Sequence, residues 1–155
     1  MAGANKKPRA LVLGHSFVQR LKEFAALNHS DGPFDQNLGL SNVCSMIFHG
    51  IGGRTVDKLI RNDLDKIRSA VPDIVVLKLG SNDLCDRDCD PETIALSIVA
   101  LAELLLKELS LQFIAVCEVT VRQNEPFAGY NDKAALLNSQ MRELLREIPA
   151  ASWFG

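Results

Sequence analysis

The sequence predicts one α/β domain, in which helices cover both faces of a parallel sheet in a three-layer α/β/α sandwich. Four short, nearly continuous apolar runs rich in β-branched residues are typical of strands buried on both faces. Segments with helical spacing of apolar residues separate these runs. Strict alternation of strand and helix favours parallel strands joined by right-handed crossovers. A chain of 155 residues, 47% of them hydrophobic, is long enough for one such domain.

The elements follow in order along the chain. Strands are expected at residues 10–13, 43–48, 74–79 and 111–117. The first helix is indicated by apolar residues at positions 17, 21, 24 and 25, and the second by apolar residues between 56 and 67, with Thr55 as its cap. Asp90, Pro91 and Glu92 are typical of a helix start and open a third helix that runs to about residue 109.

A last helix is expected around residues 137–148, with Asn131 or Asp132 as its cap. Residues 150–155 resemble the beginning of a fifth strand, which we expect to be incomplete. Residues 1–8 are expected to form a disordered tail, and residues 9–155 the domain. We find neither a repeat nor a linker that would divide it.

Composition and charge argue against nucleic-acid binding, membrane binding and secretion. The net charge of −2 provides no basic field for nucleic acid or for anionic membranes. No window approaches the roughly 20 apolar residues that span a bilayer, and the N-terminal apolar stretch is too short for a signal peptide. Four cysteines without a secretion signal are expected to be reduced. These features predict a cytoplasmic protein.

Polar and glycine-rich segments follow the first three predicted strands. Ligands of open parallel sheets bind beyond the carboxyl ends of the strands. If the strands lie in the spatial order 2-1-3, all three segments meet at one edge of the sheet. The segments are Gly14-His15-Ser16, His49-Gly50-Ile51-Gly52-Gly53-Arg54-Thr55 and Gly80-Ser81-Asn82-Asp83.

Three residues of these segments suit acyl transfer. Ser16 would place a hydroxyl at a helix N-terminus, whose dipole favours developing negative charge. Gly53 would offer a backbone N–H with no side chain in the way, and Asn82 a carboxamide N–H. A serine hydroxyl with convergent neutral donors is the equipment for attack on a carbonyl carbon.

The segments LVLGHSF, HGIGGRT and LGSND, in this order and spacing, resemble three of the four sequence blocks of the SGNH (GDSL-like) hydrolases. The resemblance extends from about residue 9 to the end of the chain. It implies a flavodoxin-like sheet of order 2-1-3-4-5 and cofactor-free esterase, lipase or deacetylase activity on a small-molecule ester. It also implies that Ser16 is the nucleophile, and that the Ser16 amide, Gly53 and Asn82 form the oxyanion hole.

The sequence departs from the family pattern at two points. His15 stands where the family usually has Asp before the nucleophile. The D-x-x-H block that carries the general base and its orienting acid is absent from the 155 residues. We therefore expect the chain to be a C-terminally truncated piece of a longer protein, and to be nearly inactive. His49 could replace the missing base or could simply pack at the strand end.

Each signal also has a structural interpretation. Ser16 could cap a helix, the glycines could serve a tight turn, and Asn82 could form an Asx turn. Arg54 and Arg122 could touch the substrate or could be ordinary surface residues.

Three other functions are weaker. The pair Cys85-x₃-Cys89 lacks the further ligands that a zinc site needs, so no metal is expected. The glycine-rich segment at residues 50–55 lacks the spacing of a nucleotide-binding motif. A non-catalytic interaction domain of the same fold is the alternative function.

Overall fold

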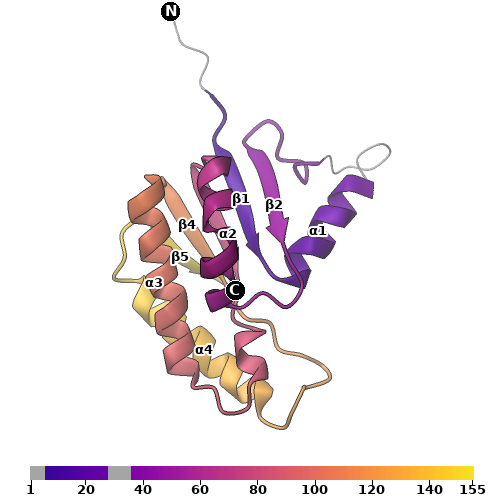
Figure 1. Ribbon diagram of the computed structural model, residues 1–155, viewed down its shortest axis with the longest axis vertical. Coiled ribbons are helices and arrows are strands. Elements are labelled where there is room, and N and C mark those ends of the chain that lie inside the picture. The colour runs from indigo at the N-terminus through magenta and orange to yellow at the C-terminus, as the bar shows by residue number, and fades with distance from the viewer. Residues whose placement is uncertain (1–5, 28–35) are drawn as a thin grey trace, which may run out of the picture.

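The computed structural model describes residues 6–27 and 36–155 (Figure 1). Within them the chain alternates strands and helices as predicted. The strands are β1 (Arg9–Gly14), β2 (Ser45–Gly50), β3 (Ile74–Lys78), β4 (Phe113–Cys117) and β5 (Ala151–Phe154). The helices are α1 (Ser16–Leu27), α2 (Val56–Ala70), the short 3-10 helix η1 (Asp83–Cys85), α3 (Pro91–Leu109) and α4 (Tyr130–Leu145).

The five strands form one sheet in the order β2-β1-β3-β4-β5, and every neighbouring pair is parallel. This confirms the predicted fold class and strand order. The fifth strand, expected to be incomplete, has four residues. They pair with β4 from Ala151 opposite Ile114 to Phe154 opposite Cys117.

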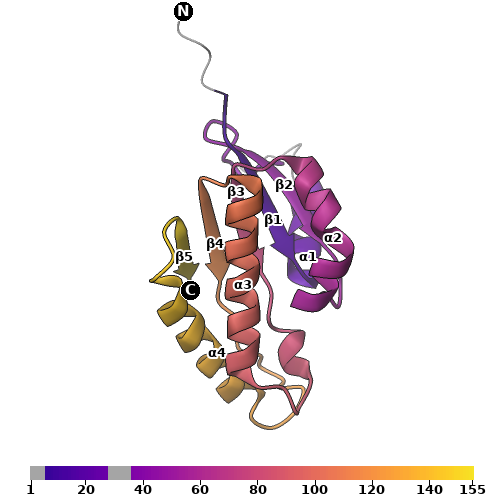
Figure 2. The ribbon, with the colours of Figure 1, turned by 60° about the vertical axis from the view of Figure 1, so that its left-hand side comes forward.

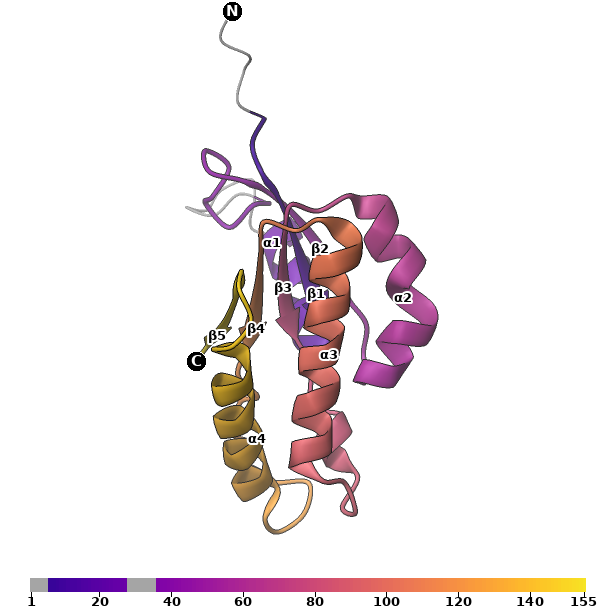
Figure 3. The same cartoon turned by 90° about the vertical axis from the view of Figure 1, so that its left-hand side faces the viewer.

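The helices divide between the two faces of the sheet. In Figure 3, α3 lies in front of the strands with α2 beside it, and α1 lies behind them. Figure 2 shows α3 running along β3 and β4. One continuous core joins α2, α3 and α4 to the strand side chains that face them, among which Leu13, Val75, Leu77 and Ile114 are fully buried. On the other face, Val18 and Ala25 of α1 are buried.

Two of the predicted caps are confirmed. The side chain of Thr55 accepts a hydrogen bond from Lys58 N at the start of α2. The Asp90 carboxylate accepts from Thr93 N at the start of α3, which has Pro91 in its first turn. Each satisfies a backbone N–H that the helix itself leaves unpaired.

The predicted cap of the last helix is wrong. Gly129, with φ 91°, precedes α4 and has no side chain to cap it, and the Glu125 carboxylate accepts a hydrogen bond from Asn131 N in the first turn at 3.0 Å. The Asn131 side chain instead accepts from Arg122 N and donates to Arg122 O. The Asn131 side chain is therefore used to bind the backbone of the segment after β4, and it is not available to cap the helix as the local pattern predicted. Several strand boundaries also shift: β1 extends from Arg9 to Gly14, β2 from Ser45 to Gly50, β3 ends at Lys78 and β4 begins at Phe113.

Two further observations concern the ends and the helices. Of the tail expected at residues 1–8, residues 1–5 lie outside the described part of the chain, and Pro8 O accepts a hydrogen bond from Ser45 N. Among the helices of the described ranges, none is both long and apolar enough to cross a bilayer.

Candidate active site

Three turns meet at the carboxyl edge of the sheet. The first turn comprises residues 14–16, the second turn residues 49–55 and the third turn residues 80–83. Gly14, the last residue of β1, lies opposite Gly50 of β2 on one side and Lys78 of β3 on the other. The arrowheads of β1 and β2 accordingly point to the same edge in Figure 1. The chain segments that follow these strands therefore leave the sheet side by side, as the predicted strand order requires.

Glycine is required at two of these strand ends because backbone passes too closely for a side chain. A Cβ on Gly14 would lie 2.3 Å from Lys78 O, and one on Gly50 would lie 2.2 Å from Gln19 N. The second contact brings the first turn of α1 directly against the end of β2. The glycines thus let the first two turns approach each other.

Ser16 is the first residue of α1 and is half-buried. In the described residues its hydroxyl has no hydrogen-bond partner. His15 takes the capping position instead: its carbonyl accepts from Val18 N and Gln19 N, and its ring Nδ1 from Phe17 N. The hydroxyl of Ser16 is therefore not used to cap the helix.

Gly53 lies in the second turn with φ 70°, a left-handed conformation that favours glycine. It is exposed, and a Cβ there would meet no atom of residues 6–27 or 36–155 within 4 Å. Its carbonyl accepts from Lys58 Nζ at 3.3 Å. Among the described residues its N–H has no partner, so it is available to an external acceptor.

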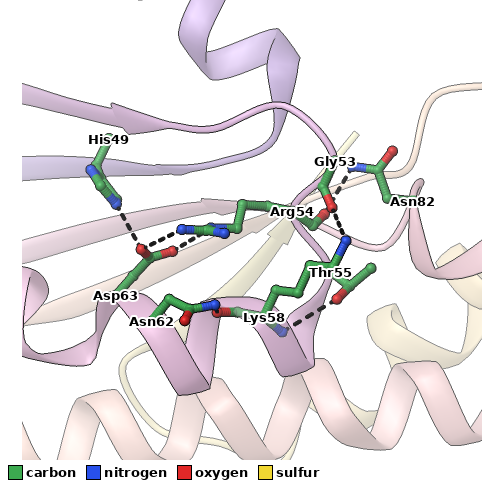
Figure 4. A network of polar contacts seen from close by, with 8 residues as sticks. All are labelled: His49, Gly53, Arg54, Thr55, Lys58, Asn62, Asp63 and Asn82. Carbon is green, nitrogen blue, oxygen red and sulfur yellow. Dashed lines mark hydrogen bonds and ion pairs between the residues drawn. The ribbon is translucent and has the colours of Figure 1, made fainter.

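The third turn is tied to the second by two hydrogen bonds. Asn82 Nδ2 donates to Arg54 O at 2.8 Å, which sets the carboxamide beside Gly53 (Figure 4). Asp83 Oδ1 accepts from Val56 N at 3.0 Å, at the first residue of α2. Burial raises the pKa of Asp83 above its ordinary value, although the bond from Val56 opposes this.

The buried carboxylate of Asp63 fixes the position of the second turn. Asp63 on α2 is 1% exposed and receives both Arg54 Nε, at 2.7 Å, and Arg54 Nη2, at 2.8 Å. His49 Nε2 lies 3.3 Å from the same carboxylate, as Figure 4 shows. Burial alone would raise the pKa of Asp63, but the hydrogen bonds from Arg54, together with the nearby His49 ring, outweigh it and hold this pKa below its ordinary value.

Two residues considered from the sequence are therefore occupied in this cluster. The guanidinium of Arg54, considered either as a substrate contact or as an ordinary surface residue, is paired with Asp63. The ring of His49, considered as a substitute base, points to Asp63 as well.

Sequence reasoning missed Asp63. A signal was present, because Asp63 falls on the same face of the helix as the buried residues Val56, Leu59 and Ile67. A charged residue in an apolar stripe indicates a paired charge.

Arg122 follows β4 and reaches the third turn. Its Nη2 donates to Ser81 Oγ at 3.4 Å, and its guanidinium stacks on the Tyr130 ring, 4.8 Å from the ring centre. It is half-buried and, in the described part of the chain, forms no ion pair with a carboxylate. Arg122 therefore brings a positive charge to the edge where the three turns meet.

In the described ranges no three His, Cys, Asp or Glu side chains are grouped so that they could hold an ion. Cys85 is exposed, Cys89 is half-buried, and both are free thiols.

Comparison with known proteins gives a family and a fold. The family model described as GDSL-like Lipase/Acylhydrolase matches residues 13–152. A search of curated proteins found no significant match.

Several solved structures are similar. One, assigned provisionally as a platelet activating factor from Streptococcus pneumonia, is 20% identical with a TM-score of 0.70, covering 98% of this chain and 67% of the other. A GDSL-like lipase from Bacteroides thetaiotaomicron is 16% identical with a TM-score of 0.68, covering 99% and 70%. A mutant acetyl-xylooligosaccharide esterase from Geobacillus stearothermophilus is 15% identical with a TM-score of 0.68, covering 92% and 73%. At these identities the likeness concerns the fold.

Proposed function

The chain belongs to the GDSL-like lipase/acylhydrolase family, and from this premise we propose that it carries out serine-dependent ester hydrolysis. Ser16 is the proposed nucleophile. The Ser16 and Gly53 amides and the Asn82 carboxamide are the proposed oxyanion hole. The observation that carries the proposal is the bond from Asn82 Nδ2 to Arg54 O, since it joins the second and third turns beside the unpaired Gly53 N–H.

The chemistry follows from these groups. Ser16 Oγ would bond to the ester carbonyl carbon, and the carbonyl oxygen would take up negative charge. Amide and carboxamide N–H groups stabilise that charge without moving, and the N-terminus of α1 adds a favourable dipole. The bond to the alcohol oxygen then breaks as that oxygen takes up the proton that Ser16 has lost. Water next attacks the acyl-Ser16 ester, returns a proton to Ser16 Oγ and releases the acyl group as an acid.

The proposed reaction also requires a group that accepts the proton of the Ser16 hydroxyl. Attack by a serine hydroxyl needs a base, and a triad enzyme stripped of its base retains roughly 10³–10⁴-fold acceleration over water. The ring of His49 lies on Asp63, and the ring of His15 accepts from Phe17 N. His29 lies outside the described residues. From the two described histidines we infer slow turnover by this chain.

The substrate proposed is a small ester, of which acetylated sugars are one class. The fold neighbours include a lipase and an acetyl-xylooligosaccharide esterase, which supports acyl ester chemistry in general. We assign Arg54 to holding the second turn, because Asp63 occupies its guanidinium. Arg122, with no carboxylate partner in the described residues, is the remaining candidate for a substrate contact.

The test is covalent labelling with a fluorophosphonate, followed by intact mass and peptide mapping. We expect slow, stoichiometric labelling of Ser16 and none in Ser16→Ala. The control is Ser97→Ala, since Ser97 is exposed on α3 and bonds only within its helix. Absence of labelling in the native chain would favour the alternative, an interaction domain of this fold.

A second measurement tests whether hydrolysis by Ser16 is limited by the lack of a base. Added imidazole can accept the Ser16 proton, so it should raise the rate of ester hydrolysis in the native chain beyond its own background. Ser16→Ala should show the imidazole background alone. Equal imidazole dependence in both chains would reject Ser16 as the nucleophile.

A further inference from the structure

His15 occupies the joint between β1 and the helix that begins with Ser16, and it is 8% exposed. Its ring Nδ1 accepts a hydrogen bond from Phe17 N at 3.3 Å. An imidazole nitrogen that accepts carries no proton, so in the neutral ring the proton resides on Nε2. The first turn of α1 therefore selects one tautomer of His15.

The protonated nitrogen faces the third turn. His15 Nε2 lies 3.4 Å from Ser81 Oγ, and Ser81, the residue before Asn82, is 6% exposed. Arg122 Nη2 also lies 3.4 Å from Ser81 Oγ. The two lone pairs of this hydroxyl oxygen can therefore accept from both His15 Nε2 and Arg122 Nη2. The Ser81 carbonyl in turn accepts from Tyr130 OH at 3.2 Å.

We propose that His15 is a positioning residue, which couples the Ser16 turn to the Asn82 turn through Ser81. One neutral ring holds the start of α1 with one nitrogen and the third turn with the other. The distance between the nucleophile and the oxyanion donor is thereby set by a side chain rather than by backbone alone. This inference rests on the function proposed above for Ser16 and Asn82.

The charges around His15 keep its ring neutral. Burial, followed by the cations Lys78 of β3, Arg122 and Arg20 of α1, lowers the pKa of His15 from 6.5 to about 4. A protonated ring would lose its acceptor for Phe17 N and would set a cation at a helix N-terminus, where the dipole is unfavourable. Near neutral pH the ring is therefore an orienting group and a poor base.

The first test is the tautomer. In ¹⁵N spectra of the native chain at pH 7, the His15 ring should show a protonated Nε2 and an unprotonated Nδ1. Its titration should fall near pH 4, well below the ordinary value of 6.5. A protonated Nδ1, or a midpoint near 6.5, would overturn the proposed role.

The second test separates positioning from folding. His15→Asn keeps a good helix-capping acceptor but cannot reach Ser81, and Ser81→Ala removes the partner of Nε2. We expect each variant to remain folded with a lower urea midpoint, because a buried polar group loses its partner. Well below that midpoint, each should label with fluorophosphonate at least tenfold more slowly than the native chain. Ser97→Ala should match the native rate. Native labelling rates in both variants would reject the coupling.

Failure of the proposed function has a different signature. If the native chain does not label at all, serine hydrolysis is rejected. The proposed coupling of the Ser16 turn to the Asn82 turn is then tested by NMR. Ser81→Ala should shift the amide resonance of Ser16, and Ser97→Ala should leave it unchanged. An unmoved Ser16 resonance in Ser81→Ala overturns the proposal.

Discussion

Asp63 is a buried charged residue that helps to hold the second turn. Its buried carboxylate receives two donors from Arg54 and lies within 3.3 Å of His49. Removing one partner of such a pair leaves an uncompensated charge in the interior, which typically costs about 3–5 kcal/mol. The same carboxylate thereby sets the position of Gly53, next to Arg54 in the chain.

We expect Asp63→Asn to lower the free energy of unfolding by about 3 kcal/mol at pH 7. Asp65→Asn, at an exposed carboxylate on the same helix, should change it by less than about 1 kcal/mol. Because the native pKa of Asp63 is lowered, its contribution is present above the ordinary value of 3.8 and is lost as the pH falls through the native pKa. Urea titrations at pH 7 and pH 3 measure both effects, and equal midpoints for the two variants would contradict this account.

Asn82 is the residue whose loss should act on the chemistry, in addition to removing the hydrogen bond to Arg54 O that joins the second and third turns. Losing one oxyanion donor costs about 10²–10³ in rate. Asn82→Ala is expected to slow fluorophosphonate labelling of Ser16 by about 100-fold. Asn62→Ala is the matched control, since Asn62 is exposed and bonds to Lys58 O within α2. A similar labelling rate for the two variants would remove Asn82 from the oxyanion hole.

At the scale of elements, the site depends on how closely α1 packs against the end of β2. A Cβ on Gly50 would lie 2.2 Å from Gln19 N, a contact that backbone cannot relieve without moving the helix. Gly52, two residues later, has only one atom within 4 Å of an added Cβ, and that atom is at the end of the Gln19 side chain.

We expect Gly50→Ala to be strongly destabilising, by about 2–3 kcal/mol, because overpacking displaces a whole element. Gly52→Ala should stay within about 0.5 kcal/mol of the native chain, since it is a surface change. Thermal unfolding followed by circular dichroism compares the two. If Gly50→Ala were as stable as Gly52→Ala, the close packing of α1 on β2 would be refuted.

At the scale of the whole molecule, one continuous core joins α2, α3 and α4 to the sheet. Leu77 lies at its centre on β3 and is fully buried, whereas Leu96 on α3 is 52% exposed. A chain with a single core of this size should unfold in one cooperative transition.

Leu77→Ala should lower the stability of the entire domain by about 2–5 kcal/mol, since it opens a cavity at the middle strand. Leu96→Ala should cost less than about 1 kcal/mol. Fluorescence and circular dichroism should report coincident urea transitions in both variants. Transitions that separate for Leu77→Ala would show that the core is not one cooperative unit.

Much of this architecture could be predicted from the sequence because the signals are local. The alternation of apolar runs and helical stripes, and the caps Thr55 and Asp90, depend on residues within one or two turns of each other. The cap of α4 was mispredicted for the complementary reason. The Asn131 side chain pairs with Arg122, nine residues earlier, and no local pattern reveals that competition.

The sequence by itself determined the class of fold, because periodicity and turn residues act over short distances. The strand order, and with it the meeting of the three turns at one sheet edge, was implied by the resemblance to the SGNH hydrolases. Only the tertiary structure decided which side chains those turns use to hold one another. His15 meets Ser81 across 66 positions, and Arg54 meets the helix face at Asp63. Such partners are chosen by the packing of whole strands and helices, which places side chains within hydrogen-bond reach regardless of their separation along the chain.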